Sequence, residues 1–99
     1  MKVMERRTQT LEKGKWDVYW AKEEKWRALE NRIGGFPAKR HTRPLSNFGT
    51  TVIWERDWES FAAMEAAYEK SSADPETQEL QKIPSGTTGE CAELFFIVP

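Results

Sequence analysis

The sequence has 99 residues, of which 15 are lysine or arginine and 16 are aspartate or glutamate, so its formal net charge is −1. A chain of this length is expected to form one domain, residues 1–99, with a thin core that five Trp, five Phe and two Tyr residues help to fill. The near-balance of charge creates no overall field toward DNA or anionic lipid, so neither nucleic acid nor a membrane is expected as a partner.

Residues 3–11 are expected to form a first strand, which ends at a turn through Gly14. The apolar residues that follow fall on one broad helical arc and predict a helix over residues 15–32. Gly34 and Gly35 are expected to end this helix, because glycine adopts the left-handed cap conformation without steric cost.

Residues 36–43 are predicted to extend as a second strand, with Pro37 near its start, where a missing N–H is tolerated. The sequence PLSNFG at residues 44–49 has the composition of a turn. Residues 50–55, TTVIWE, predict a third strand because β-branched and aromatic side chains suit a pleated sheet.

A second helix is predicted over residues 58–71, with Asp57 or Ser60 as its cap. The sequence Asp-Pro-Glu at residues 74–76 then restarts a short helix, since Asp caps and Pro is tolerated in the first turn. Residues 90–98, ECAELFFIV, read as a final, largely apolar strand.

This order of strands and helices predicts an α+β, ferredoxin-like βαββαβ domain with a four-stranded antiparallel sheet and its helices on one face. The other face of such a sheet is bare. In the third strand Val52, Trp54 and Arg56 point to one face, and the residues between them point to the other. Because each face then mixes apolar and polar side chains, we expect a homodimer in which two open sheet faces enclose a cavity for a small apolar or aromatic ligand.

The single cysteine, Cys91, excludes an intrachain disulfide, and no cluster of Cys and His suggests zinc. Charged residues follow Met1, and no apolar run approaches about 20 residues, so we expect neither a signal peptide nor a membrane span. These features predict a cytoplasmic protein in which Cys91 is a small buried strand residue.

Several short segments resemble a known family. Residues 6–16, RRTQTLEKGKW, are similar to the "ELRTYTLKPGK" opening of NIPSNAP-like domains in the dimeric α/β-barrel superfamily. Residues 44–47 and 52–54 resemble that family's "G-P-L-N…W" segment, and residues 58–63 and 74–76 resemble its helix start and its "DPEW" helix. The sequence departs from the family where Gln9, Lys13 and Thr77 stand in place of Tyr, Pro and Trp.

The resemblance implies a homodimer whose two sheets face each other across a pocket. The relatives that this resemblance implies include cofactor-free monooxygenases acting on polycyclic phenols, muconolactone isomerases and haem-degrading enzymes. The NIPSNAP branch itself has no agreed chemistry. We therefore expect a protein without a cofactor, acting as a monooxygenase or isomerase on a planar apolar substrate. Fold-level analogy implies a pocket rather than a particular reaction.

Two residues are candidates for catalysis. His41 is the only side chain with an ordinary titration near neutral pH, which suits a general base or a haem ligand. Arg7 aligns with the arginine of the family opening, and on the open face its guanidinium would bind an anionic or enolate oxygen. A surface histidine and a salt bridge between Arg7 and a glutamate such as Glu5 are the structural alternatives.

Four residues are candidates for ligand binding. Trp54, together with Val52, would line one side of a pocket for a flat ligand. Packing in the core or at a dimer interface is the alternative for Trp54. Glu23, like Glu30, lies within the aromatic arc of the first helix and is a candidate acid. Arg40 belongs to a basic stretch of the second strand that otherwise reads as a solvated edge.

Three other functions compete with an enzyme or ligand-binding protein. A non-catalytic dimerisation or interaction module would fill its interface with side chains alone. RNA binding by a motif of the same strand-helix order fails, because the first strand has no stacking aromatics and the third lacks the required glycine. Haem binding would depend on one histidine.

Overall fold

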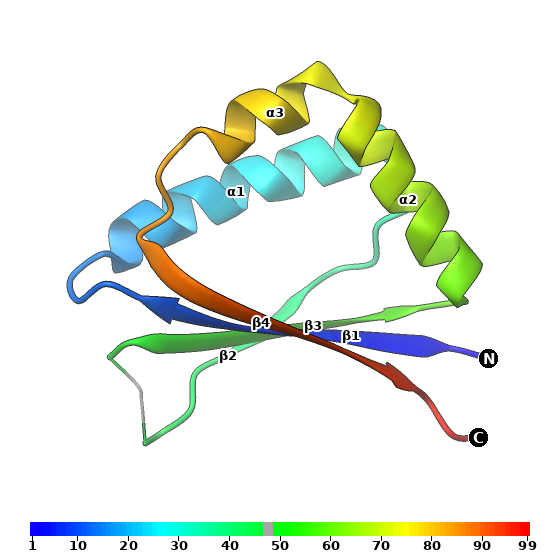
Figure 1. The fold of residues 1–99 in the computed structure, drawn as a ribbon, viewed down its shortest axis with the longest axis horizontal. Coiled ribbons are helices and arrows are strands. Elements are labelled where there is room, and N and C mark those ends of the chain that lie inside the picture. Colours follow the sequence, from blue (N-terminus) through cyan, green and yellow to red (C-terminus); the bar gives the residue numbers. More distant parts are fainter. Residues whose placement is uncertain (47–48) are drawn as a thin grey trace.

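The computed structural model describes residues 1–46 and 49–99. It contains strands β1 (Val3–Leu11), β2 (Arg40–Thr42), β3 (Thr51–Trp58) and β4 (Thr87–Phe96), and helices α1 (Trp16–Ile33), α2 (Phe61–Ala73) and α3 (Pro75–Gln81). The strands form one antiparallel sheet in the order β2-β3-β1-β4, and all three helices lie on the same side of it (Figure 1). No helix in these two ranges combines the length and hydrophobicity needed to cross a membrane.

The largest difference from the predicted elements is the length of β2. Only residues 40–42 pair with β3, whereas the sequence predicted a strand from residue 36. Gly34 and Gly35 both have positive φ, and Pro37 cannot donate a backbone hydrogen bond, so residues 34–39 cross from α1 to the sheet without pairing. Of the predicted turn at 44–49, residues 47 and 48 lie outside the described residues.

The other elements are confirmed with shifted ends. β3 runs three residues further than predicted, to Trp58, and β4 begins at Thr87 rather than at residue 90. The Ser60 side chain caps α2 by accepting from the Ala63 N–H, and the Asp74 side chain caps α3 by accepting from the Glu76 N–H.

The helix side of the sheet has an apolar cluster at each end and a polar layer between them. One cluster joins Val3, Trp58, Met64 and Ala67, and the other joins Leu11, Tyr19 and Val52. Along β1 the helix-side residues are, in order, Val3, Glu5, Arg7, Gln9 and Leu11, so the three residues between the clusters are polar. The fold therefore encloses charged groups in the middle of its core.

The open face of the sheet carries a mixture of side chains, as predicted. Glu55 of β3 bridges Arg6 of β1 and Arg40 of β2, and the Arg6 guanidinium lies over the Phe95 ring of β4. Cys91 of β4 is exposed in the single chain, so the expectation that it is buried is wrong for this chain alone. Nearly all residues of the outer strand β4 are exposed, which shows that helices α1 and α3 leave this strand uncovered.

Candidate functional site: a polar layer beneath helix α1

One half of the polar layer is organised around Glu5, whose side chain is only 1% exposed. Its carboxylate accepts hydrogen bonds from the Tyr68 hydroxyl at 2.7 Å, from Trp58 Nε1 at 3.0 Å and from Arg7 Nε at 3.0 Å. Arg56 Nε adds a fourth contact at 3.3 Å. These four donors come from β1, β3 and α2, so one carboxylate ties together three elements that are distant in the sequence.

Arg56 extends this group to helix α1. Its Nη1 donates to Glu30 Oε1 at 2.9 Å, and its Nη2 donates to the Tyr68 hydroxyl at 2.8 Å. The guanidinium also lies within 5.1 Å of the ring centres of Phe36, Trp54 and Trp58. A buried arginine whose N–H groups have acceptors and whose guanidinium lies close to aromatic rings is well satisfied. We call Glu5, Arg7, Arg56, Glu30 and Tyr68 the Glu5 cluster.

The contacts of the Glu5 cluster shift its ionisation. Burial raises the pKa of Glu5, but the hydrogen bonds from Tyr68 and Trp58 and the charges of Arg56 and Arg7 outweigh burial, so that its pKa is lowered from 4.5. Burial raises the pKa of Tyr68 to about 12. Glu5 is therefore ionised and Tyr68 is protonated at neutral pH.

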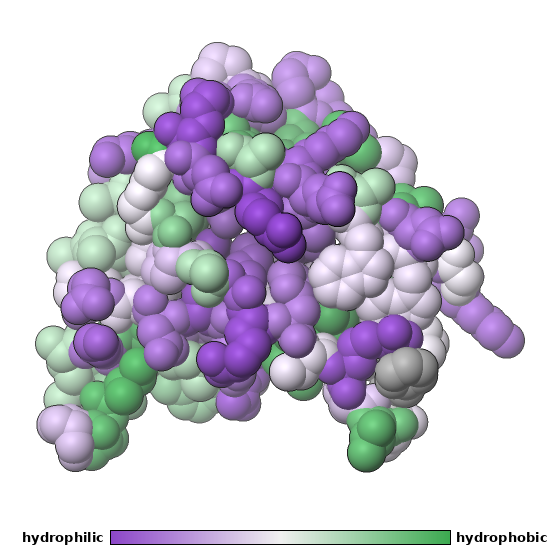
Figure 2. Space-filling view, turned by 180° about the vertical axis from the view of Figure 1, so that it is seen from behind, coloured by the Kyte–Doolittle hydropathy of each residue, from purple (hydrophilic) through white to green (hydrophobic). Residues whose placement is uncertain are grey.

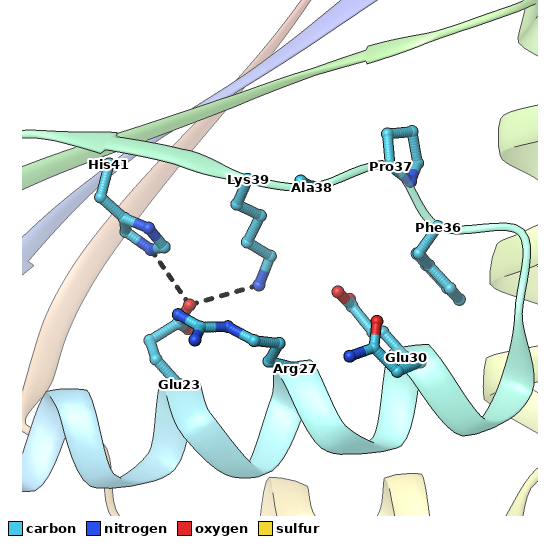
Figure 3. A pocket seen from close by; sticks show the side chains of 9 residues that line it. Glu23, Arg27, Glu30, Phe36, Pro37, Ala38, Lys39 and His41 are labelled. Carbon is cyan, nitrogen blue, oxygen red and sulfur yellow. Dashed lines mark hydrogen bonds and ion pairs between the residues drawn. The ribbon is translucent and has the colours of Figure 1, made fainter.

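The other half of the polar layer is organised around Glu23 of α1 (Figure 3). Its Oε2 atom lies 3.1 Å from His41 Nε2 and 3.4 Å from Lys39 Nζ. Burial raises the pKa of Glu23, but the hydrogen bond with His41 and the charge of Lys39 outweigh burial and lower it from 4.5. We call Glu23, His41 and Lys39 the Glu23 cluster.

Aromatic side chains hold the Glu23 cluster in place. The His41 ring packs edge-on against Trp20, with 5.0 Å between ring centres. Lys39 Nζ lies 4.5 Å from the centre of the Trp54 ring, and the Lys39 side chain is 13% exposed. Both partners of Glu23 therefore have restricted positions in a largely buried setting.

The Glu23 cluster borders three cavities, and Lys39 lines the two larger ones. A cavity of about 520 Å³ lies between α1 and the segment before β2, with Glu23, Glu30 and Arg27 on one side and Phe36, Pro37 and Ala38 on the other (Figure 3). A second cavity of about 320 Å³ lies between α1, α3 and the sheet, lined by Trp26, Trp54 and Gln81 among others. Glu23, Glu30 and Lys39 line both cavities, so they form the wall between them. Figure 2 shows that the face holding α1 and β2 is mainly hydrophilic at its centre.

The structure brings four of the six predicted site residues into the polar layer. His41 and Glu23 are hydrogen-bonded, Trp54 lies under Lys39, and Arg7 lines the second cavity. The expected position of Arg7 on the open face is wrong. Arg7 pairs with Glu5 and with Glu90 on the helix side, because the alternation along β1 places it beside Glu5.

The structure does not place the other two predicted residues at either cavity. Val52 is fully buried in the apolar cluster with Leu11 and Tyr19, because it points toward the helices at the apolar end of β3. Arg40 lies on the open face, where it pairs with Glu55 and its side chain remains 66% exposed. Arg40 and His41 are adjacent in β2, and adjacent side chains of a strand point to opposite faces of the sheet.

Sequence reasoning missed Lys39, Arg56 and Tyr68. For Arg56 a signal was available, because the alternation of β3 places it on the same face as Trp54, and both residues are buried. For Lys39 no signal was available, because residue 39 was assigned to a regular strand. Within residues 1–46 and 49–99, no group of three or more His, Cys, Asp or Glu side chains is arranged to hold a metal ion.

Comparisons with known proteins give information on the fold. No protein-family model and no curated protein matches the sequence. A NIPSNAP family protein from Agrobacterium tumefaciens str. C58 superposes with a TM-score of 0.80 at 14% identity, over 98% of this chain and 86% of that chain. SnoaB, a cofactor-independent oxygenase from Streptomyces nogalater, superposes with a TM-score of 0.74 at 14% identity, over 99% of this chain and 94% of that chain.

A third solved structure contains a ligand. The monooxygenase from the gene ActVA-Orf6 of Streptomyces coelicolor, in complex with nanaomycin D, superposes with a TM-score of 0.64 at 20% identity, over 98% of this chain and 91% of that chain. The chain shares the fold of these proteins. This is a ferredoxin-like α+β fold, which confirms the predicted fold class and, at the level of the fold, the resemblance to NIPSNAP-like domains.

Proposed function

We propose that the protein binds a small planar molecule beneath helix α1 and that His41 removes a proton from it. The observation that carries this proposal is the hydrogen bond between Glu23 and His41 at the wall of a 520 Å³ cavity. That volume lies within the usual range of ligand sites. Phe36, Pro37 and Ala38 give the cavity an apolar side for a flat ring, opposite the charged side chains of α1.

The Glu23 carboxylate sets the proton positions of the His41 ring. Because the pKa of Glu23 is lowered, its carboxylate is ionised at neutral pH and can only accept a hydrogen bond. His41 Nε2 therefore carries the proton that it donates to Glu23, and Nδ1 of the neutral ring is the atom that accepts a proton. When Nδ1 does so, the adjacent carboxylate stabilises the imidazolium.

Proton removal is a step that the candidate reactions share. An isomerase returns the proton at another carbon, and a cofactor-free oxygenase allows the resulting anion to react with dioxygen. Similarity of fold to a cofactor-independent oxygenase and to a monooxygenase with a bound ligand supports this class of reaction. The proposed ligand is a planar compound with an acidic O–H or C–H bond.

The test measures binding and turnover of naphthols. Quenching of Trp fluorescence reports binding, since Trp20 packs against His41 and Trp54 lies against Lys39 at the 520 Å³ cavity. An oxygen electrode without added cofactor reports oxygenation. Where a naphthol is turned over, His41→Gln is expected to lower the rate at least about 100-fold. Glu23→Gln is expected to lower it as well, whereas Glu24→Gln, an exposed neighbour on α1, should match wild type. Binding that none of these changes affects would contradict the proposed site.

We also propose a homodimer through the open face of the sheet. Met4, Ile53 and Phe95 provide apolar area on that face, and the exposed Arg40 offers an ion-pair partner to a second copy. Sedimentation should show a dimer for wild type and a monomer for Ile53→Glu, because the change removes apolar area from the interface and buries a charge there. A monomeric wild-type protein would contradict this assembly.

One observation favours a second function, that of a non-catalytic interaction module. Among the described residues, every buried side-chain nitrogen and oxygen has a hydrogen-bond partner, so the polar layer is satisfied without a ligand. In that case a dimer would form, naphthols would not bind, and His41→Gln would leave the dimer intact. The fluorescence titration and the sedimentation experiment together separate the two functions.

A further inference from the structure

The cations around the two cavities differ in how many acceptors they already have. Arg56 contacts Glu5, Glu30 and Tyr68, and Arg7 contacts Glu5 and Glu90. Lys39 has three N–H donors and one carboxylate contact, to Glu23 at 3.4 Å, which is long for a charge-assisted hydrogen bond. Arg27 of the larger cavity is exposed. Among the described residues, Lys39 is therefore the largely buried cation of this layer with the most remaining capacity to bind an anion.

The position of Lys39 suits contact with a ligand in either cavity. Its side chain lies in the wall between the cavities of 520 and 320 Å³. Packing of the ammonium over the Trp54 ring at 4.5 Å restrains the side chain without consuming its hydrogen bonds. Its carboxylate partner is the same Glu23 Oε2 atom that His41 contacts, so the ammonium and the imidazole converge on one point.

The charges of the Glu23 cluster balance before and after a proton transfer. With a neutral ligand hydroxyl and a neutral His41, the Glu23 carboxylate and the Lys39 ammonium neutralise each other. After the ligand O–H bond breaks and a bond to His41 Nδ1 forms, imidazolium pairs with Glu23 and leaves Lys39 opposite the new oxyanion. Two ion pairs then replace one, so the transfer leaves no unpaired charge in the low-dielectric site.

We propose that Lys39 is the oxyanion-binding residue of the site, and that its ligands are planar compounds with an acidic hydroxyl group, such as phenols and enols. This inference rests on the proposed function and assigns to Lys39 the role that the sequence suggested for Arg7. Arg7 already has two carboxylate partners, and its removal from them would leave Glu5 short of a donor. The ammonium of Lys39 leaves Glu23 when the imidazolium forms there, and it then binds the ligand oxygen.

The experiment uses para-nitrophenol, whose anion is coloured, as the probe. The pH at which the bound probe ionises is measured by absorbance with wild type, Lys39→Met, Lys39→Arg and the control Lys25→Met. Lys25→Met is the same substitution at an exposed residue of α1. We expect wild type to favour the bound anion over the bound phenol by roughly tenfold relative to free solution, as a charge within contact distance does. Lys39→Met should abolish this preference, and Lys39→Arg should retain most of it.

The outcomes distinguish this inference from the function on which it rests. An anion preference that survives in Lys39→Met, while His41→Gln abolishes it, would overturn the role of Lys39 and leave the proposed base intact. Binding of the probe only as the neutral phenol would also overturn it. Absence of any binding to wild type would overturn both proposals. Thermal unfolding of each variant checks that the fold persists, and Lys39→Arg with wild-type behaviour supports the inference even if Lys39→Met unfolds.

Discussion

Glu5 and Glu23 lie in the same polar layer, and both have a pKa lowered from its ordinary value, but their surroundings differ. Four side chains donate to Glu5, and its own side chain is 1% exposed. Glu23 has two partners, is 10% exposed and borders three cavities. A lowered pKa alone would assign both to a functional site.

The comparison shows that the number and geometry of partners separate a structural carboxylate from a candidate functional one. The donors around Glu5 come from β1, β3 and α2, and Glu5 itself lines none of these three cavities. The partners of Glu23 are a lysine with spare donors and a histidine whose Nδ1 has no hydrogen bond within residues 1–46 and 49–99. Substitution of Glu5 should therefore mainly lower stability, whereas substitution of Glu23 should mainly alter ligand chemistry.

The largest effect is expected for Glu5→Gln. This change keeps the shape of the side chain but leaves the buried Arg56 and Arg7 short of a counter-charge. We expect the free energy of unfolding to fall by about 3–5 kcal/mol, which is typical when one partner of a buried ion pair is removed. Denaturant unfolding followed by circular dichroism measures this. A loss as small as that of an exposed residue would show that Glu5 does not organise the layer.

The next effect concerns acid. Glu5 and Glu23 have lower pKa values in the folded chain than the ordinary 4.5, so the unfolded chain binds more protons as the pH falls through this range. Their contribution to stability is thus complete above pH 4.5 and is lost as the pH falls through the folded values. Unfolding midpoints measured across acidic pH should fall more gently in Glu5→Gln and Glu23→Gln than in wild type. Equal slopes in all three proteins would contradict the lowered values.

A smaller effect on stability is expected for Glu23→Gln. The amide oxygen still accepts from His41 or Lys39, and the cavity admits water to the group that loses its partner. We expect a decrease in unfolding free energy of about 1 kcal/mol, which denaturant unfolding followed by circular dichroism measures. A decrease as large as that of Glu5→Gln would show that Glu23 is a structural carboxylate as well.

The smallest effect is expected for Arg40→Gln. Arg40 pairs with Glu55 on the open face, where its side chain is 66% exposed, and Arg6 keeps Glu55 paired. We expect the unfolding free energy of the monomer to change by less than about 0.5 kcal/mol and naphthol binding to remain as in wild type. A loss of ligand affinity would contradict the placement of Arg40 outside the site.

The sequence predicted the fold well because its signals are local. Gly34 and Gly35 ended α1, and Asp74 and Pro75 started α3, through backbone chemistry that neighbouring residues determine. The salt bridge between Arg7 and Glu5, which was the structural alternative for Arg7, is present, but it lies on the helix side of the sheet and not on the open face. Trp58, Tyr68 and Arg56, which satisfy Glu5 on the helix side, lie more than 50 residues away in the sequence.

The candidate site was predicted only in part for the same reason. His41 and Glu23 were chosen singly, by residue type and by position on a helical arc, and their hydrogen bond depends on how α1 crosses β2. Lys39 escaped notice because residues 36–39 were assigned to a strand, whereas they form the wall of the larger cavity. Pairings between elements depend on packing that periodicity in one segment does not specify.

The shortness of β2 has a consequence for motion. His41 is the middle residue of a strand that pairs with its neighbour over only three residues, at an edge of the sheet. Few backbone hydrogen bonds must break for this segment to separate from β3, so we expect amide hydrogen exchange to be faster in β2 than in β1 or β3. The larger cavity could then admit a molecule by local opening of β2 while the long central strands, and the core that they carry, stay closed.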